Sequence, residues 1–224
     1  MGAYHWEQCN RASRNYNPPL EARYEVVVRE VRRWASLDTV LDLGCGDGYL
    51  MAQASPYAKR IIGIDTEVKG VHLAKHMLAT HDNCEVYLGN GYDLPFPDNS
   101  FDAVLLADVI EHLVHPDACL GELRRVLKPG RGLWLTTPKW RPDRMWDERH
   151  IQEFKPQALQ ALLERYFGSV RLSFFWPIKW TNFYSTQFGW KLVKHIARRV
   201  NNPFYRESDT NPERFGQIKA VCCK

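Results

Sequence analysis

The sequence predicts a single-domain, doubly wound α/β fold, in which helices cover both faces of a mostly parallel sheet. A chain of 224 residues that is 45% hydrophobic is long enough to bury one sizeable core. Short apolar runs alternate with segments whose apolar residues recur at helical spacing. The runs are nearly all apolar, which is typical of strands buried on both faces of a parallel sheet.

Each expected element follows from its own pattern. A first helix is expected over "PPLEARYEVVVREVRRW", because two prolines precede apolar residues spaced three or four apart. Apolar runs predict strands at "TVLDLG", "RIIGID", "CEVYLG", "FDAVLLA", "GLWLTT", "SVRLSFF" and "IKAVCC". Helical spacing predicts helices at "VHLAKHMLA", "DACLGELRRVL" and "PQALQALLERYF", and "KPG" and "PDNS" supply breaks between elements.

Composition narrows the class of protein. The sequence has no run of eighteen or more apolar residues and no apolar signal core at its start, so we expect a cytoplasmic protein without a transmembrane segment. Its six cysteines show no metal-ligand spacing, which favours reduced thiols. The net charge is +4, but residues 176–224 hold nine Lys and Arg against three Asp and Glu. Solvated helix faces are the commoner explanation, ahead of an anionic substrate, nucleic acid or membrane.

The stretch "VLDLGCGDGYL" places Gly44, Gly46 and Gly48 directly after the first predicted strand. In doubly wound sheets ligands bind beyond the carboxyl ends of the strands, and glycine lets a ligand approach the backbone closely. A dinucleotide fingerprint reads GxGxxG, whereas this turn reads GxGxG and comes after Asp42. An acid there would repel a pyrophosphate, so the turn favours a ligand with an ammonium group and no phosphate.

With four further segments, the sequence resembles the class I S-adenosylmethionine-dependent methyltransferases. Asp65 ends the second predicted strand, and "GNGYDLPFPDNSFDAVLLADVIEHL", "LRRVLKPGRGLWLTTP" and "RHIQEFKPQALQALLERYF" are similar to later segments of the branch that includes quinone-ring methyltransferases. The resemblance covers roughly residues 40–175. It implies a Rossmann-like sheet of seven strands with an antiparallel last strand, S-adenosyl-L-methionine as cofactor, and methyl transfer (EC 2.1.1).

The resemblance also implies roles for individual residues. Asp42 would order the methionine end of the cofactor, Asp65 would hold the ribose, and Asn90 would meet the adenine in place of the Asp usual in the family. Ala107 and Asp108 would flank the sulfonium. The whole implied cofactor-binding set is Asp42, Gly44, Cys45, Gly46, Gly48, Asp65, Thr66, Asn90, Gly91, Tyr92, Ala107 and Asp108. The structural alternatives are a tight turn for the glycines and an ordinary turn for Asn90.

His112 and His150 are the candidate general bases, with Glu111 beside them, because histidine exchanges protons near neutral pH. The pair "EH" is also structural in many members of this branch. An alternative resemblance is to small-RNA 3′-terminal 2′-O-methyltransferases, in which an ExxEH stretch and a later His hold a divalent ion. Asp108, Glu111, His112 and His150 match that pattern in part, but Lys139 stands where Asn is expected. We therefore expect no metal ion and no nucleic-acid acceptor.

The acceptor is predicted from the remaining segments. Residues 1–37 are expected to form a helical cap, in which Tyr4, His5 and Trp6 fold over the cofactor. Residues 38–175 are expected to form the cofactor-binding core, and residues 216–224 the last strand. The aromatic insertion 176–215 could line an acceptor pocket, form a lid, pack in the core or form a homodimer contact; we favour pocket or lid. The loop "KWRPDRMWDERH" interleaves Lys and Arg, Arg144 included, with Trp, and suits an anionic or aromatic group.

The amphipathic stretch "KLVKHIARRV" suits a core helix, or else a membrane surface or an anionic acceptor. The function that these observations favour is O-methylation of a small-molecule, glycan or lipid-like acceptor by in-line methyl transfer. The alternatives are metal-assisted RNA methylation and a binding protein that holds the cofactor without turnover.

Overall fold

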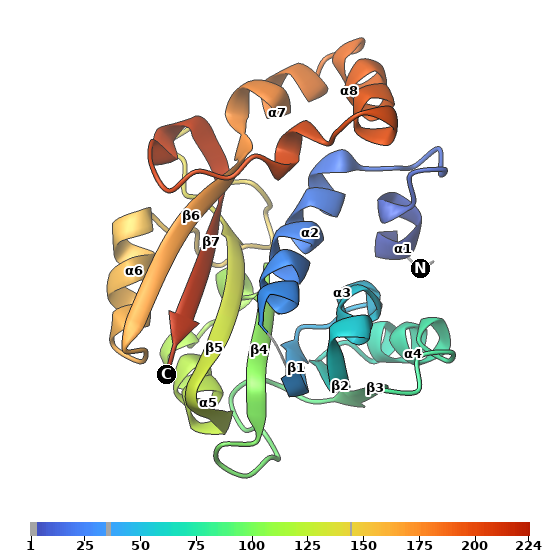
Figure 1. Cartoon of the computed structure of the whole chain (residues 1–224). Coiled ribbons are helices and arrows are strands. Elements are labelled where there is room, and N and C mark those ends of the chain that lie inside the picture. The colour runs from blue at the N-terminus through green and yellow to red at the C-terminus, as the bar shows by residue number, and fades with distance from the viewer. Residues whose placement is uncertain (1–3, 35–36, 144) are drawn as a thin grey trace.

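In the computed structural model, the described residues are 4–34, 37–143 and 145–224, and they form a seven-stranded sheet covered by helices (Figure 1). The strand order is β3-β2-β1-β4-β5-β7-β6. All pairs are parallel except those of β7, which runs antiparallel to both β5 and β6. The strands are β1 (Leu37–Leu43), β2 (Ala58–Asp65), β3 (Cys84–Leu88), β4 (Phe101–Ala107), β5 (Leu127–Pro138), β6 (Ser169–Pro177) and β7 (Phe215–Cys223). The predicted fold class is confirmed, including the antiparallel last strand.

The sheet has a switch point between β1 and β4. From β1 the chain continues outward to β2 and β3, then returns to add β4 on the other side of β1. Connections therefore leave β1 and β4 in opposite directions, which opens a crevice at their carboxyl ends. Gly44, Asp65 and Asp108 each stand directly after or at the end of one of these strands, so the topology gathers them at one edge.

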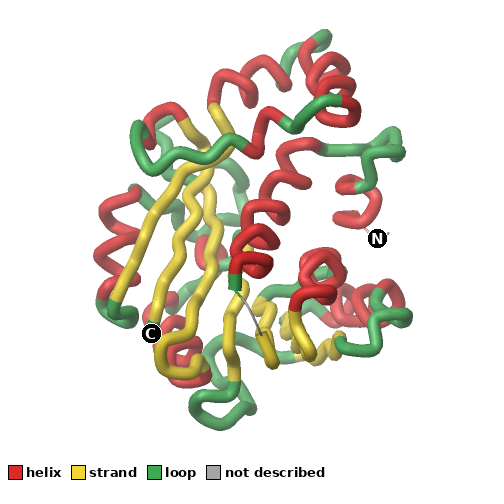
Figure 2. The backbone as a smooth tube through the Cα atoms, in the orientation of Figure 1, coloured by secondary structure: helices red, strands yellow, loops and turns green. Residues whose placement is uncertain are grey.

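Helices cover the two faces of the sheet, as Figure 2 shows. One buried core joins the sheet to α5 (Pro116–Val126) and α6 (Pro156–Glu164), and the other joins it to α2 (Pro18–Arg33), α3 (Tyr49–Ala54) and α4 (Val68–Met77). The remaining elements are α1 (Tyr4–Cys9), α7 (Ile178–Tyr184), α8 (Gly189–Arg199) and the 3₁₀ turns η1 (Ser55–Tyr57), η2 (Ile110–His112), η3 (Pro203–Tyr205) and η4 (Pro212–Arg214).

The residues between β6 and β7 are packed onto α2. Phe204 and Val193 are completely buried and form a small cluster with Ala22 of α2. Trp176 donates its indole N–H to the carbonyl oxygen of Pro19 (2.8 Å). These contacts anchor α7 and α8 above the amino end of α2, next to the carboxyl edge of the sheet.

Among the described residues, no helix is both long enough and apolar enough to cross a bilayer.

Candidate active site

A cavity of about 550 Å³ opens at the carboxyl edge of the sheet. That volume lies in the range of ligand sites in proteins. One part of its wall comes from the glycine turn and the start of α4, and another from the segment after β4, the loop that carries His150, and Trp176. The predicted site residues that line it are Gly46, Asp108, Glu111, His112 and His150. Residues from distant parts of the sequence thus meet in one space.

The three glycines of the turn have different structural reasons. All have positive φ, between 53° and 79°, a region that favours glycine. A Cβ on Gly44 would lie 2.4 Å from Cγ2 of Val109, and one on Gly48 would lie 2.7 Å from Cδ1 of Leu78. A Cβ on Gly46 would meet only the ring of His5, at 3.5 Å. Gly44 and Gly48 therefore serve the turn and its packing, and Gly46 presents bare backbone to the cavity.

Asp65 holds the glycine turn in place. Its Oδ2 accepts a hydrogen bond from the amide of Gly46 (2.8 Å), and its Oδ1 accepts one from the amide of Glu67 (2.8 Å). Each carboxylate oxygen has a second lone pair. Asp65 can therefore accept hydrogen bonds from two ligand hydroxyls while it still orders both amides.

Asp42 is buried behind the turn with an unused acceptor. The residue is 2% exposed, and its Oδ2 has no hydrogen-bond partner among the described residues. Burial, and to a smaller extent the charge of Asp65, raises the pKa of Asp42 to about 8. A buried carboxyl group without a partner is costly, so this acceptor suits a site in which a ligand or an ordered water supplies the donor.

The residues predicted near the adenine lie outside the cavity wall. Oδ1 of Asn90 accepts from the amide of Tyr92 (2.8 Å), which leaves the Asn90 side-chain amide as a donor. A Cβ on Gly91 would lie 2.7 Å from the side chain of Leu43, so this glycine permits close packing against β1. The side chain of Cys45 is buried in the core, Thr66 is exposed, and Ala107 is half-buried against the core.

Asp108 is held in an unusual backbone conformation by contacts from three elements. Its φ is 53°, which is uncommon for a residue other than glycine and marks functional sites when the surroundings enforce it. The hydroxyl of Thr136 donates to its Oδ1 (2.7 Å), and Nε2 of Gln217 lies 3.5 Å from its Oδ2. Arg23 of α2 forms an ion pair with the same Oδ2 (2.7 Å) and also lies over the ring of Trp176.

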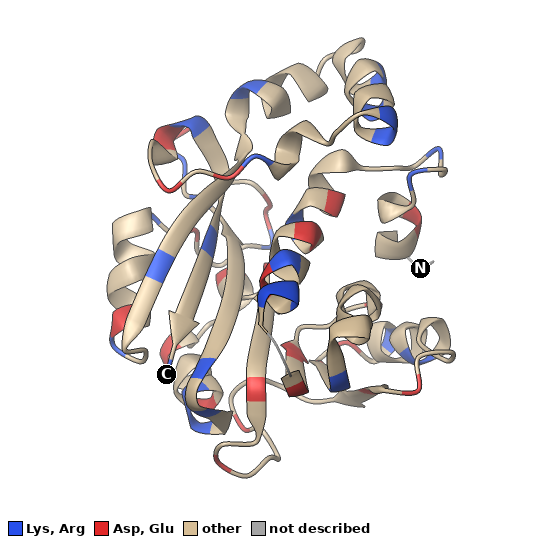
Figure 3. Cartoon of the chain, viewed as in Figure 1, with Lys and Arg blue, Asp and Glu red and all other residues tan. Residues whose placement is uncertain are grey.

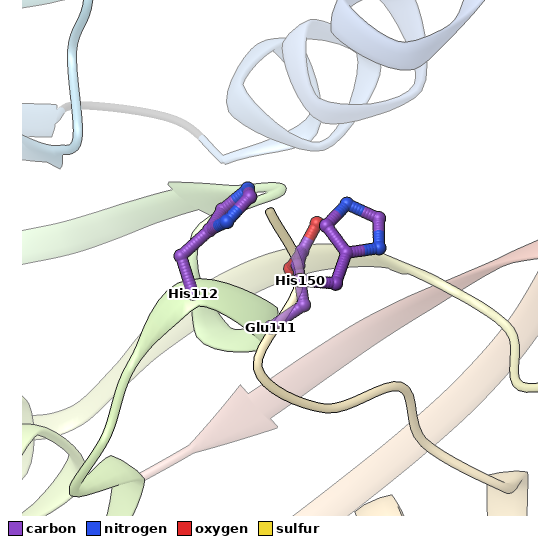
Figure 4. A group of neighbouring side chains, drawn as sticks. All are labelled: Glu111, His112 and His150. Carbon is purple, nitrogen blue, oxygen red and sulfur yellow. The ribbon is translucent and has the colours of Figure 1, made fainter. Parts of the chain in front are cut away.

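Glu111, His112 and His150 form a compact group, drawn in Figure 4. One potential metal-ligand atom from each residue lies within 4.8 Å of those of the other two. The carbonyl oxygen of Glu111 accepts from the amides of Ile151 and Gln152, and these bonds hold the His150 loop against η2. The hydroxyl of Thr137 donates to Oε2 of Glu111 (2.9 Å), whereas its Oε1 has no partner among the described residues. Burial and the charge of Asp108 raise the pKa of Glu111 well above its ordinary value.

Both histidine rings are oriented through Nδ1. Nδ1 of His150 lies 2.7 Å from Oε1 of Glu153, and Nδ1 of His112 lies 3.1 Å from the carbonyl oxygen of Arg149. A carbonyl or carboxylate oxygen only accepts, so we assign the proton to Nδ1 in each ring. This assignment leaves Nε2 as the basic nitrogen of each histidine, and only His150 is supported by a carboxylate.

Sequence reasoning missed several residues of the site. Glu153 was visible in "RHIQEF", three residues after His150, but nothing in the sequence marked it as the partner of that ring. Arg23 lies on the first long helix and reaches the site only through tertiary packing. Arg144 of the predicted basic loop lies outside the described residues.

The amino-terminal helix α1 lies against the glycine turn. His5 donates its backbone amide to Oδ2 of Asp47 (2.8 Å), and its ring Nδ1 lies 2.9 Å from Oδ1. The indole N–H of Trp6 donates to the carbonyl oxygen of Asp47 (2.8 Å). Tyr4 and His5 form part of the cavity wall. Asp47, inside the glycine turn, is the anchor for this helix.

The fold and the crevice define a doubly wound α/β domain built to hold a ligand at its switch point. Residues 41–135 match a family model described as a methyltransferase domain. The chain is 33% identical over 147 residues to a probable S-adenosylmethionine-dependent methyltransferase of Mycolicibacterium smegmatis, a match that covers 63% of this chain and 56% of the relative. It is 37% identical over 100 residues to a demethylmenaquinone methyltransferase of Symbiobacterium thermophilum. This match covers 42% of this chain and 39% of the relative.

A solved structure shares the fold. The YcgJ protein of Bacillus subtilis superposes on this chain with a TM-score of 0.66 and 19% sequence identity. The match covers 91% of this chain and 99% of the YcgJ chain. The matched region spans only about half the length of the curated relatives, or less. Residues 41–135 therefore match a methyltransferase domain, and the chain is similar in sequence to S-adenosylmethionine-dependent methyltransferases and has a fold shared by a solved structure.

Proposed function

We propose that this protein transfers the methyl group of S-adenosyl-L-methionine to a hydroxyl oxygen of a small-molecule, glycan or lipid-like acceptor. The observation that carries the proposal is one cavity whose wall contains both Gly46, with its bare backbone, and two histidines whose rings are oriented through Nδ1. Cofactor and acceptor must meet within one space for an in-line transfer.

The residues present fit this cofactor. Gly46 leaves its face of the turn open, Asp65 keeps free lone pairs on both oxygens, and Asp42 retains an unused buried acceptor. Together they suit a nucleoside with ribose hydroxyls and an ammonium group. The cofactor, when bound, supplies a methyl group already activated by the sulfonium. We assign the adenine to the Asn90 side-chain amide and the neighbourhood of the sulfonium to Ala107 and Asp108.

His150 is the proposed general base. Its Nε2 would take the proton of the acceptor hydroxyl as the oxygen gains the methyl group, and the Glu153 carboxylate would stabilise the ring that has become positive. His112 is the second candidate, supported by a carbonyl oxygen only. The raised pKa of Glu111 favours its protonated form, so we assign it a hydrogen-bonding role instead of proton abstraction.

The acceptor pocket is proposed to lie between Arg23, Trp176 and the two histidines. Trp176 offers an aromatic face, and it also has a positive φ of 61°, which is strained for so large a side chain. Among relatives, the quinone named in the demethylmenaquinone methyltransferase is a lipid-like ring compound, which supports this class of acceptor.

The test is formation of S-adenosylhomocysteine by the purified protein, measured by mass spectrometry with panels of phenols, sugars and reduced quinones. We expect turnover with one panel and a loss of about 100-fold in His150→Ala. Cofactor affinity measured by calorimetry should be unchanged in that variant. Cofactor binding without turnover on any panel would instead indicate a protein that holds the cofactor and does not catalyse.

A second candidate function is metal-assisted methylation of a ribose hydroxyl at the 3′ end of an RNA. The observation that favours it is the group of Glu111, His112 and His150, in which each Nδ1 contacts an oxygen acceptor, as the non-ligating nitrogen of a metal-binding histidine usually does. Two imidazoles and one carboxylate suit Mn²⁺ or a similar ion. Asp108 is not part of this group, because Arg23 and Thr136 occupy its carboxylate.

Manganese titration distinguishes the two candidates. If the second is correct, the protein binds Mn²⁺ in calorimetry, His150→Ala abolishes that binding, and the label from the cofactor appears on the 3′-terminal ribose of a short RNA. His115→Ala, on a histidine outside the group, is the matched control. Full turnover on a small-molecule acceptor in the presence of a chelator would remove the second candidate.

A further inference from the structure

Helix α8 presents one face to the protein and the opposite face to solvent. Val193 and Ala197, one turn apart, are completely buried and face the core of the insertion. At 100° per residue, Lys191, His195 and Arg199 point away from them, and all three are exposed. We call the exposed residues Phe188, Lys191, Leu192, His195 and Arg199 the α8 surface.

Apolar side chains lie among these cations. Phe188 is 69% exposed and Leu192, one turn later, is 38% exposed. Val200, just after the helix, is 82% exposed, and Trp190, on the same side of the helix as Val193 and Ala197, is 40% exposed. A single exposed apolar residue is normal on a protein surface. Several of them on one helix and its ends call for an apolar partner.

The charge of this region has one sign. Between Glu164 and Glu207 the sequence holds no Asp or Glu, and in Figure 3 the ribbon of α8 carries the colour of Lys and Arg and not that of Asp and Glu. Lys194 and Arg198 donate to backbone oxygens of residues 13 and 14, which fixes the helix against the amino-terminal segment. Lys191 and Arg199 have no ion pair with any residue that the structure describes. Their charges are available to an external anion.

We propose that the α8 surface binds the surface of an anionic lipid bilayer. Within a few ångströms, a bilayer offers anionic headgroups to Lys191 and Arg199 and an apolar layer to Phe188 and Leu192. Nucleic acid would satisfy the cations but would leave the aliphatic side chains exposed, and a second copy of this basic surface would bring like charges together.

The binding would place the cavity near the lipid. Val193 of α8 packs in the same cluster as Trp176, and Trp176 forms part of the cavity wall. Helix α8 would therefore lie between the bilayer and the cluster that contains Trp176. The proposal itself does not depend on the proposed methyl transfer.

Co-sedimentation of the full chain with vesicles tests the proposal. The probes are vesicles of phosphatidylcholine alone and vesicles of phosphatidylcholine mixed with phosphatidylglycerol. We expect binding to the anionic vesicles only, weakened by added salt. Each cation near an anionic surface contributes about fivefold to the partition coefficient, so Lys191→Glu with Arg199→Glu should lower it by about 25-fold or more.

A second pair of substitutions tests the apolar part. Phe188→Gln with Leu192→Gln should lower partition by at least about tenfold, because less apolar surface is buried in the bilayer. The matched control is Lys75→Glu with Arg124→Glu, which changes net charge by the same amount on α4 and α5, at the far end of the molecule (Figure 1). Those charges lie beyond the range of screened interactions with α8, so the partition coefficient of the control variant on anionic vesicles should equal that of the wild type.

Several outcomes would overturn the proposal. The first is that the protein binds both vesicle types equally, and the second is that it binds neither. The third is that Lys191→Glu with Arg199→Glu leaves vesicle binding unchanged. A dimer in sedimentation equilibrium that Phe188→Gln with Leu192→Gln dissociates, without vesicle binding, would assign the surface to a second copy instead. Cofactor affinity is measured on every variant as well, so that a loss of vesicle binding can be distinguished from a failure of the methyltransferase proposal.

Discussion

Asp42→Asn should remove a component of the pH dependence of stability. In the folded protein the Asp42 carboxyl group is buried, one oxygen has no partner among the described residues, and its pKa is raised to about 8 from an ordinary value near 3.8. Between these two values the unfolded chain has an ionised Asp42, whereas the folded chain keeps the proton. Folding therefore takes up a proton in this range, and the free energy of unfolding falls as pH rises.

The size of the effect follows from linkage. One extra proton bound by the folded state lowers the free energy of unfolding by about 1.4 kcal/mol for each pH unit. Between about pH 5.5 and about pH 7.5 the loss is about 2–3 kcal/mol, or about 5–10 °C in Tm for a chain of this size. Asn at position 42 has no proton to lose, so its variant should lack this part of the decline.

Urea unfolding followed by far-ultraviolet circular dichroism, at several pH values across that range, measures the difference. Other titrating groups act equally in both proteins, so the wild-type curve minus the variant curve isolates Asp42. Asp82→Asn is the control, because that residue is exposed. Parallel curves for wild type and Asp42→Asn would refute the reasoning. The same variant should bind the cofactor more weakly, since the amide replaces one of the two carboxyl oxygens that can accept a hydrogen bond with a nitrogen that only donates.

Three further substitutions test other parts of the structure. Asp65→Ala should weaken cofactor binding at least about 100-fold in calorimetry, because two hydrogen bonds to a charged group are lost; unchanged affinity would contradict the ribose assignment. His5→Ala should speed dissociation of S-adenosylhomocysteine in stopped-flow fluorescence, because α1 loses one of its three contacts with Asp47, that of the His5 ring; an unchanged rate would argue against α1 as a cover of the ligand. Lys219→Met should lower the free energy of unfolding by about 3 kcal/mol, because it leaves Glu30 buried with less compensation; chemical denaturation within error of wild type would argue against that ion pair.

The sequence was sufficient to predict the fold class and the residues that lie at the carboxyl ends of the strands. Buried parallel strands have near-continuous apolar runs, and the topology brings the carboxyl ends of β1, β2 and β4 to one edge of the sheet. The positions of the glycine turn, Asp65 and Asp108 follow from that rule alone. The sequence could not show that only Gly46 of the three glycines faces the cavity, because that depends on the side chains of Val109 and Leu78.

The other half of the site could not be predicted from local pattern. Arg23 lies outside the region of resemblance and reaches the cavity only through the packing of α2. His5 and Trp176 belong to segments that the sequence placed near the cofactor and the acceptor, but their positions in the cavity wall depend on the packing of α1 and the insertion. Periodicity shows which face of α2 is apolar, but it does not show that Arg23 at the edge of that face meets Asp108. The proximity of His112 and His150 likewise depends on two backbone hydrogen bonds to the carbonyl oxygen of Glu111.

Unsatisfied polar atoms gather at the same edge of the sheet. Native proteins pair nearly all buried polar groups, since an unpaired one costs about 1–3 kcal/mol. Here Asp42, Glu111, Glu153 and Gln217 each have a buried side-chain oxygen without a partner among the described residues. All four lie at or beside the carboxyl ends of strands β1, β4, β5 and β6. A ligand that brings hydrogen-bonding groups to this edge, beside the strained Asp108, would recover part of this cost.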